Sequence, residues 1–543
     1  MASPLDCVAD LVVIGAQVVT MNAAQPRAEA FAVADGVVVR VGSDAEMASC
    51  RGPATVVYNA AGLTVLPGFV DAHAHPGDSG MEAGFVDLDG AHSMEAVVAR
   101  ATAWRAAHPD AKWVQGGPWD GIALASVAPL AALDAEFGTT PVFLWSEDGH
   151  SAWVNTAALR AGRLLTENVP RGGQVVRDAS GGLTGVIREA AVDAVTAVMP
   201  VPTADAVDAG ITSALLELRR YGITSVIEAS SDLSLLAGWR RAERAGRLTA
   251  RVFAAMPIDL GEGAPAVARV AKLARKYRSE RLRVNAIKLF VDGVVEPKTA
   301  LMLDPYIGGG TGPVQFEDAE LDELFDSADA AKLQIHAHAI GDAAVRQVLD
   351  AESRLVARRG PADRRPILAH LEFVSPVDAP RFATLGAIAD LQALWAYPDP
   401  YVTALTVPVV GEARANAAYP FAMLAKAGAP LAAGSDWSVT TLNPWPAIEV
   451  AVTRRDPDAP GEVLGVGQGL TLDQIVAAYT LGGAHAIFAD TWLGQIAPGF
   501  KADFVVLDRD PWAIPTEELS DVKVKLTAVD GELFSRGFVD SGN

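Results

Sequence analysis

Short apolar runs separated by turn-forming residues recur along this chain of 543 residues. In its central part they alternate with stretches of helical periodicity at residues 204–221, 321–331 and 343–358. Repeated strand–helix units over this length predict an α/β protein built on a TIM-type barrel, whose chemistry lies at the carboxyl ends of the strands. The strand-like runs are residues 141–145, 224–228, 251–256, 284–291, 333–338, 366–370, 388–391 and 431–435.

Both ends of the chain carry a different pattern, in which short strands follow one another with tight turns. The first end has runs at 11–14, 17–20, 30–33 and 37–40, and Asp35-Gly36 between the last two is a hairpin signal. The second end has runs at 504–508 and 522–529. We therefore predict one β-domain from residues 1–64 plus 490–543, and a catalytic barrel domain from 65–489.

Residues 80–205 break the strand–helix rhythm. This stretch holds five tryptophans, and we interpret it as a large insertion that caps the barrel mouth. The tryptophans are Trp104, Trp113, Trp119, Trp145 and Trp153.

Composition narrows the possible partners. Half of the residues are hydrophobic and a fifth are charged, which fits a globular protein with a sizeable core. The net charge of −22 argues against nucleic acid or an anionic membrane surface and suits an enzyme for small molecules. With only Cys7 and Cys50, neither a disulfide framework nor a thiolate metal cluster is available. A metal would be held by histidine, carboxylate or a modified lysine.

The first residues lack a basic segment followed by a long apolar stretch, and no apolar run of about 18 residues reads as a membrane span. We therefore expect a cytoplasmic protein with no membrane partner. A homodimer is the default expectation for a soluble enzyme.

The clearest chemical signal is the run LPGFVDAHAH at residues 66–75. Side chains of a strand alternate between its faces, so His73 and His75 point to the same side and could converge on one ion. Asp71 shares that face and could lie deeper, where it would orient an imidazole.

Lys288 is the only charge inside the apolar run 284–291. Burial lowers the pKa of an ammonium group and favours the neutral amine, which can take up CO₂ to form a carbamate that bridges two metal ions. The alternative is a lysine whose charged end reaches water from the strand end.

Further candidate ligands end later strands. His336 and His338 share one strand face, and we choose His338 as the ligand because it lies nearer the strand's carboxyl end, with His336 as a core or supporting histidine. His370 closes the next apolar run, and Asp436 ends another. A carboxylate at a strand tip is a candidate ligand or general base. The ordered series of His-x-His, Lys, His, His and Asp predicts a metal centre.

With these motifs the chain resembles the amidohydrolase superfamily, in particular the amidohydrolase family 3 branch typified by YtcJ-like proteins and N-substituted formamide deformylase. The resemblance extends over nearly the whole chain. It rests on PGFVDAHAH (67–75), DGHSAWVN (148–155), KLFVDG (288–293), HAIGD (338–342), GSDW (434–437) and PGFKAD (498–503). The stretch 294–300 departs from the small-residue loop common in that branch, which leaves its substrate contacts open.

This resemblance implies a distorted (β/α)8 TIM barrel with a small β-sandwich domain from both termini. It implies one or two metal ions, usually Zn²⁺, with other divalent metals such as Mn²⁺ as alternatives. The implied ligands are His73, His75 and Asp436 for one ion and His338 with His370 for the other, bridged by carboxylated Lys288.

The implied reaction is hydrolysis of a C–N bond by a metal-activated hydroxide, with Asp436 as general base and then acid. His150 is a candidate to hydrogen-bond the substrate or its oxyanion, or else a structural residue of the insertion. Four tryptophans could line an apolar pocket for a small N-substituted amide, formamide or carbamate; alternatively, they fill the seam between insertion and barrel. They are Trp119, Trp153, Trp395 and Trp437.

The sequence also leaves other functions open. A metal-dependent deaminase or cyclic amidase is the nearest alternative, but the glutamate that deaminases place beside the strand-5 histidine is missing after His338. A non-catalytic binding or scaffold homologue would be expected to lose ligands, whereas every expected type is present. Isomerisation or decarboxylation could use the same site.

Overall fold

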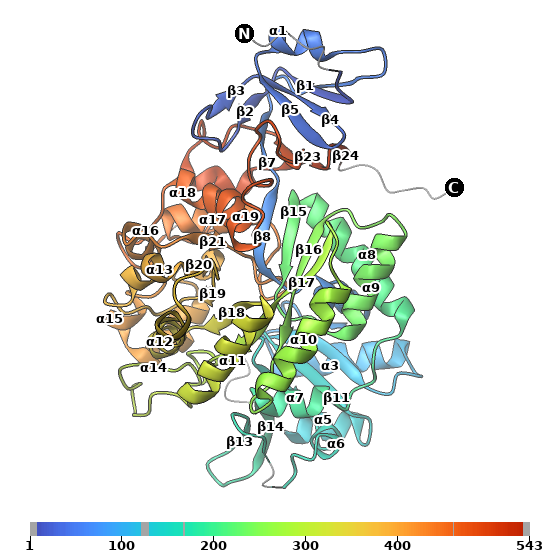
Figure 1. The fold of residues 1–543 in the computed structure, drawn as a ribbon. Coiled ribbons are helices and arrows are strands. Elements are labelled where there is room, and N and C mark those ends of the chain that lie inside the picture. Colours follow the sequence, from blue (N-terminus) through green and yellow to red (C-terminus); the bar gives the residue numbers. More distant parts are fainter. Residues whose placement is uncertain (1–7, 121–129, 167–168, 460, 536–543) are drawn as a thin grey trace.

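The computed structural model describes residues 8–120, 130–166, 169–459 and 461–535. Its centre is a mixed α/β barrel of eight parallel strands, which confirms the predicted fold (Figure 1). In order of pairing the strands are β8 (Phe69–Ala74), β15 (Ile223–Glu228), β16 (Arg251–Pro257), β17 (Leu282–Phe290), β18 (Gln334–Ala339), β19 (Ile367–His370), β20 (Ile388–Leu391) and β21 (Leu431–Ala433). Backbone hydrogen bonds from Asp436 to His73 and from His75 to Trp437 join the chain after β21 to β8 and nearly close the ring.

Helices cover the outside of the barrel (Figure 1). The three predicted helical stretches are confirmed as α8 (Ala204–Arg220), α11 (Asp318–Ala331) and α12 (Asp342–Arg359). The side chain of Thr203 caps the first turn of α8, and Arg219 and Arg220 lie in its last turn, where they favour the helix dipole. Other outer helices are α9 (Leu233–Arg244), α10 (Gly263–Lys276), α13 (Ala379–Leu385) and α17 (Pro444–Thr453).

Strands from the two ends of the chain share one sheet, seen as blue and red strands at the top of Figure 1. Its order is β24 (Glu532–Ser535), β23 (Val524–Val529), β22 (Phe504–Leu507), β7 (Thr64–Pro67), β2 (Gln17–Val19) and β3 (Arg27–Ala28). A second sheet has the order β5 (Val37–Gly42), β4 (Ala30–Ala34), β1 (Leu11–Ile14) and β6 (Val56–Asn59). The Asp35-Gly36 turn joins β4 to β5 in an antiparallel hairpin, as predicted.

A charge cluster with a buried arginine at its centre joins this terminal domain to the barrel. Arg251, at the start of β16, donates through Nε to Asp503 over 3.1 Å and also contacts Asp530. Arg281 donates to the same Asp530 carboxylate over 2.6 Å. Asp503 ends the PGFKAD run, so that motif has a structural role in joining the two units.

The insertion forms its own sheet, at the opposite end of the barrel from the terminal domain (Figure 1). Its order is β13 (Gln174–Arg177), β14 (Leu183–Arg188), β12 (Ser151–Val154), β11 (Val142–Ser146), β10 (Val114–Trp119) and β9 (Val86–Asp87). The run at 141–145 therefore belongs to the insertion and not to the barrel. Helices α3 (Met94–Ala107), α5 (Leu130–Phe137), α6 (Thr156–Ala161) and α7 (Ala190–Thr196) complete it. Among the described residues, no helix combines the length and apolar character needed to cross a bilayer.

Candidate metal centre

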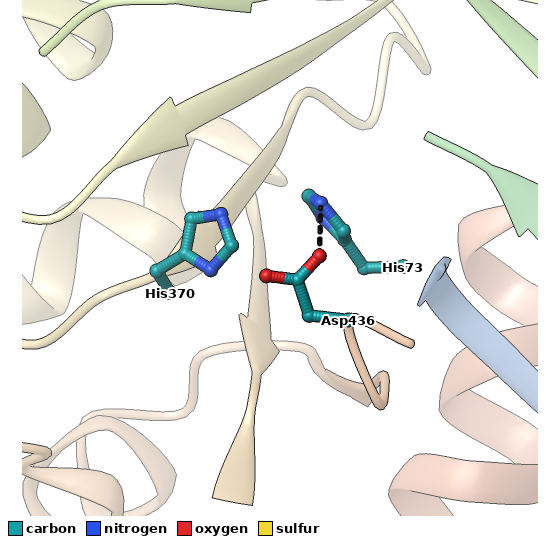
Figure 2. A group of neighbouring side chains, drawn as sticks. All are labelled: His73, His370 and Asp436. Carbon is teal, nitrogen blue, oxygen red and sulfur yellow. Dashed lines mark ion pairs between the residues drawn. The ribbon is translucent and has the colours of Figure 1, made fainter. Parts of the chain in front are cut away.

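The predicted ligands gather at the carboxyl ends of the barrel strands, on the side of the insertion. His73 lies on β8, Lys288 on β17 and His370 at the end of β19. His75 directly follows β8, and Asp436 lies three residues after the end of β21. Figure 2 shows His73, His370 and Asp436 facing one another. Strands that are distant in sequence therefore bring polar side chains together at their carboxyl ends, where the active site of a TIM barrel lies.

Four donor atoms form the tightest part of this cluster. Asp436 Oδ1 lies 3.2 Å from His75 Nε2 and 3.6 Å from His73 Nε2. Lys288 Nζ lies 3.2 Å from His73 Nε2. Ligand atoms about 2.1 Å from a tetrahedral metal ion are roughly 3.4 Å apart. The observed separations therefore suit donors that share one ion.

His338 and His370 form the neighbouring part, with ring centroids 4.4 Å apart. His370 also lies close to His73, at 4.8 Å between ring centroids, and with His73 and Asp436 it forms a group of potential ligand atoms within 4.8 Å of one another. His370 Nδ1 is buried and has no hydrogen-bond partner among the described residues. A buried imidazole nitrogen without a partner is costly unless an ion or water completes it.

Backbone conformation also marks this site. His370 and Asp436 have φ angles of 79° and 54°, in the left-handed region that side chains rarely adopt. Such strain accumulates at active sites, where the surrounding structure fixes it.

The protonation states of these side chains favour metal binding. Burial lowers the pKa of His73, His338 and His370 well below the usual value, so their imidazoles are neutral with a lone pair available. Burial lowers the pKa of Lys288 to about 8, which makes the neutral amine accessible. Burial alone would raise the pKa of Asp436, but the hydrogen bond and charge of His75 lower it below its ordinary value. The donor set thus fits a divalent metal.

A layer of hydrogen bonds holds the ligands. Asp292 accepts three backbone N–H groups, from Leu301, Ile340 and Gly341, and its Oδ1 lies 3.2 Å from His338 Nδ1. A proton on Nδ1 then leaves His338 Nε2 free to ligate. Gln392 accepts from the backbone N–H of His370 over 2.7 Å, which holds the main chain of that ligand.

The insertion contributes His150 to this centre. Its ring centroid lies 4.7 Å from that of His338, and its Nδ1 lies 3.0 Å from Glu189 Oε2. Burial alone would lower the pKa of His150, but the charge and hydrogen bond of Glu189 raise it to about 9. This pKa favours the imidazolium form near neutral pH, in which the second ring nitrogen also carries a proton that it can donate.

Comparison with known proteins agrees with this geometry. The family model described as "Amidohydrolase family" matches residues 56–534. The chain belongs to the amidohydrolase family.

Relatives of this amidohydrolase match nearly its full length. The putative amidohydrolase YtcJ of Bacillus subtilis is 29% identical, over 96% of this chain and 98% of that protein. The N-substituted formamide deformylase of Arthrobacter pascens is 27% identical, over 96% and 98%. A solved structure of an uncharacterized metal-dependent hydrolase from Pyrococcus horikoshii superposes with a TM-score of 0.75 at 25% identity, over 93% of this chain and 99% of that one. This amidohydrolase is a metal-dependent hydrolase.

Of the four tryptophans predicted for the pocket, two lie in the core of the insertion and two lie beside candidate ligands. Trp119 and Trp153 are buried in the hydrophobic core of the insertion, with Trp119 Nε1 bonded to the Leu144 carbonyl. Trp395 stacks on His370, with centroids 5.1 Å apart and rings 2° from parallel, and Trp437 directly follows Asp436. A pocket role for Trp119 and Trp153 stays a prediction, whereas Trp395 contacts a candidate ligand.

Several residues of the site were not predicted from the sequence. Asp390 is the only charge in the apolar strand β20, the same signal that singled out Lys288, and its Oδ2 lies 3.6 Å from His73 Nδ1. Phe290 ends β17 and lies 5.8 Å from His338 between ring centroids, with 38% of its surface exposed. Glu189 had no sequence signal, because the pairing of β12 with β14 brings it to His150.

Proposed function

We propose that this amidohydrolase cleaves the C–N bond of a small N-substituted amide, formamide or carbamate. The observation that carries the proposal is the position of Asp436, whose Oδ1 faces His75 and His73 while its other carboxylate oxygen points toward His370 (Figure 2). In this proposal one oxygen would ligate the metal and the other would exchange a proton.

His73, His75, His338, His370 and Asp436 would hold the metal, and Zn²⁺ suits this mixture of imidazole and carboxylate donors, with Mn²⁺ as an alternative. A bound divalent metal supplies an acidified water and polarises the substrate carbonyl. Lys288 would complete the donor set: its amine nitrogen would form a bond to the carbon of CO₂ and release a proton, which would leave an anionic carbamate able to ligate a metal.

The protein side chains then move one proton. Asp436 accepts it from the attacking water and delivers it to the nitrogen that leaves, so the amine departs neutral. His150, charged by its pairing with Glu189, donates its free ring N–H to the carbonyl oxygen as negative charge develops there.

The walls of the site support an apolar nitrogen substituent. Phe290 and Trp395 each lie against a candidate ligand histidine, and Phe290 is partly exposed beside the centre. Aromatic faces favour an apolar or aromatic group over a charged one. The relative from Arthrobacter, a deformylase of N-substituted formamides, supports the same class.

A substrate panel tests this proposal. Enzyme loaded with zinc is assayed on formamides, acetamides and carbamates that carry N-benzyl, N-butyl or N-methyl groups, and release of the amine is measured. We expect turnover of the bulky N-substituted members and loss of turnover after chelation. Absence of C–N cleavage on the whole panel by enzyme shown to retain its metal would refute it.

Phe290→Ala is expected to raise KM for N-benzyl substrates by about 10- to 200-fold, because the loss of apolar contact in a hydrophobic pocket costs roughly 1–3 kcal/mol. KM for N-methyl substrates should change little. Phe488→Ala is the matched control, since Phe488 has the same exposed fraction of 38% but lies at the other end of the barrel. An equal change in KM for both kinds of substrate would show that Phe290 does not contact the nitrogen substituent.

His150→Ala is expected to lower kcat by roughly 10²- to 10³-fold, the usual loss on removing one donor to an oxyanion. Metal content should stay at the wild-type value, because His150 is a donor and not a ligand. His108→Ala, a change at an exposed histidine of the same insertion, is the control. A fall in metal content would instead make His150 part of the metal centre.

A further inference from the structure

A buried hydrogen-bond arrangement lies beneath the metal centre. The second ring nitrogen of His73, Nδ1, points away from Asp436 toward two groups on other strands. His336 Nε2 on β18 lies 2.9 Å from it, and Asp390 Oδ2 on β20 lies 3.6 Å from it. All three residues are fully buried.

The two distances decide which group His73 uses. A neutral imidazole carries one N–H, and its other nitrogen holds the lone pair. If His73 Nε2 is to face a metal together with Asp436 and His75, its proton must sit on Nδ1. That N–H lies within hydrogen-bond distance of His336, whereas the separation from Asp390 is too long.

We propose that His336 is a positioning residue for the metal centre: its Nε2 accepts the hydrogen bond from His73 Nδ1 and so holds His73 in the tautomer that ligates. This inference rests on the metal centre of the proposed function. It concerns metal affinity and does not depend on which C–N bond is cleaved.

These hydrogen bonds also give the two histidines of β18 different roles. His338 has its Nδ1 beside Asp292, which leaves Nε2 for a metal. His336 has its Nε2 occupied by His73, and its own proton must then lie on Nδ1. Strand β18 therefore supplies both His338 as a candidate ligand and, two residues earlier, His336 as the group that orients His73 of β8.

The buried state of His336 supports a functional reason for its presence. Its Nδ1 is enclosed and has no hydrogen-bond partner among the described residues, a condition that costs free energy. Ligating histidines are more often oriented by a carboxylate or a backbone carbonyl. An imidazole acceptor orients His73 without adding a further carboxylate to a site that already contains Asp71, Asp390 and Asp436.

Zinc affinity tests the proposal. Apoenzyme of the wild type, His336→Leu, His336→Gln and Asp390→Asn is titrated with Zn²⁺ against a chromophoric chelator, which gives both affinity and ions per chain without any substrate. Removing such an orienting partner typically weakens metal binding about 10- to 100-fold. We expect that loss in His336→Leu, with the wild-type number of ions at saturation. His336→Gln should recover most of the affinity, because its amide oxygen accepts the same hydrogen bond.

Three results would overturn the proposal. Wild-type affinity in His336→Leu would make His336 a core residue. One ion fewer at saturation in both His336 variants would make it a ligand, for example of an ion shared with Asp390. A loss in Asp390→Asn as large as that in His336→Leu would assign the orienting role to the carboxylate. If circular dichroism shows that His336→Leu does not fold, His336→Met takes its place in the comparison with His336→Gln.

Discussion

Asp436→Asn is expected to lower kcat by roughly 10³- to 10⁴-fold, at the upper end of the range for removing a general acid–base group, because the change also weakens a ligand. The asparagine keeps the size of the side chain but cannot accept the proton of the attacking water. Its amide oxygen is a poorer metal donor than a carboxylate, so zinc affinity should fall as well. Both quantities are measured on the same preparation, with kcat taken at saturating zinc.

Asp490→Asn is the control for this experiment. Asp490 also pairs with a histidine, His485, and with Arg365, but it lies at the amino-terminal end of the barrel strands. This variant should keep wild-type kcat and zinc affinity. Activity within 10-fold of the wild type in zinc-saturated Asp436→Asn would show that Asp436 does not transfer the proton.

Arg251→Met is expected to destabilise the protein by about 3–5 kcal/mol, because breaking a buried ion pair leaves an uncompensated charge. The side chain of Arg251 is completely buried, and Asp503 beside it is nearly so. Methionine fills much of the volume but leaves the Asp503 carboxylate without the guanidinium. Asp530 keeps Arg281 as a partner, so the loss falls mainly on Asp503.

Urea unfolding followed by circular dichroism measures this loss. Glu217→Ala is the control, because it removes an ion pair to Arg220 in which both side chains are substantially exposed. Exposed pairs contribute little, so we expect a change below about 1 kcal/mol. If both variants shift the free energy of unfolding equally, the cluster does not fasten the terminal domain to the barrel.

The barrel could be predicted because each of its strands is an apolar run that ends in a turn. The buried faces of parallel strands leave few polar positions, so Lys288 stood out in β17. Asp390 carries the same signal in β20, but no motif drew attention to it. Its relation to His73 follows from the closing of the barrel, which sequence spacing does not reveal.

The division of roles between His336 and His338 could not be read from their spacing. Both lie on one face of β18, and only their neighbours distinguish them: His73 on β8 for His336, and Asp292, just after β17, for His338. The tryptophans of the insertion illustrate the same limit, because a tryptophan that fills a core and one that lines a pocket have the same local sequence. Trp153 is fully enclosed, whereas Trp395 contacts His370.

The most direct test of the metal centre is metal content per chain, measured by elemental analysis on wild type and Lys288→Ala purified without chelator. We expect close to two ions in the wild type and one or none in the variant. His150→Ala, prepared in parallel, should match the wild type. One ion in both wild type and Lys288→Ala would contradict the carbamate bridge, and no metal in either protein, even after addition of zinc or manganese, would contradict the metal centre itself.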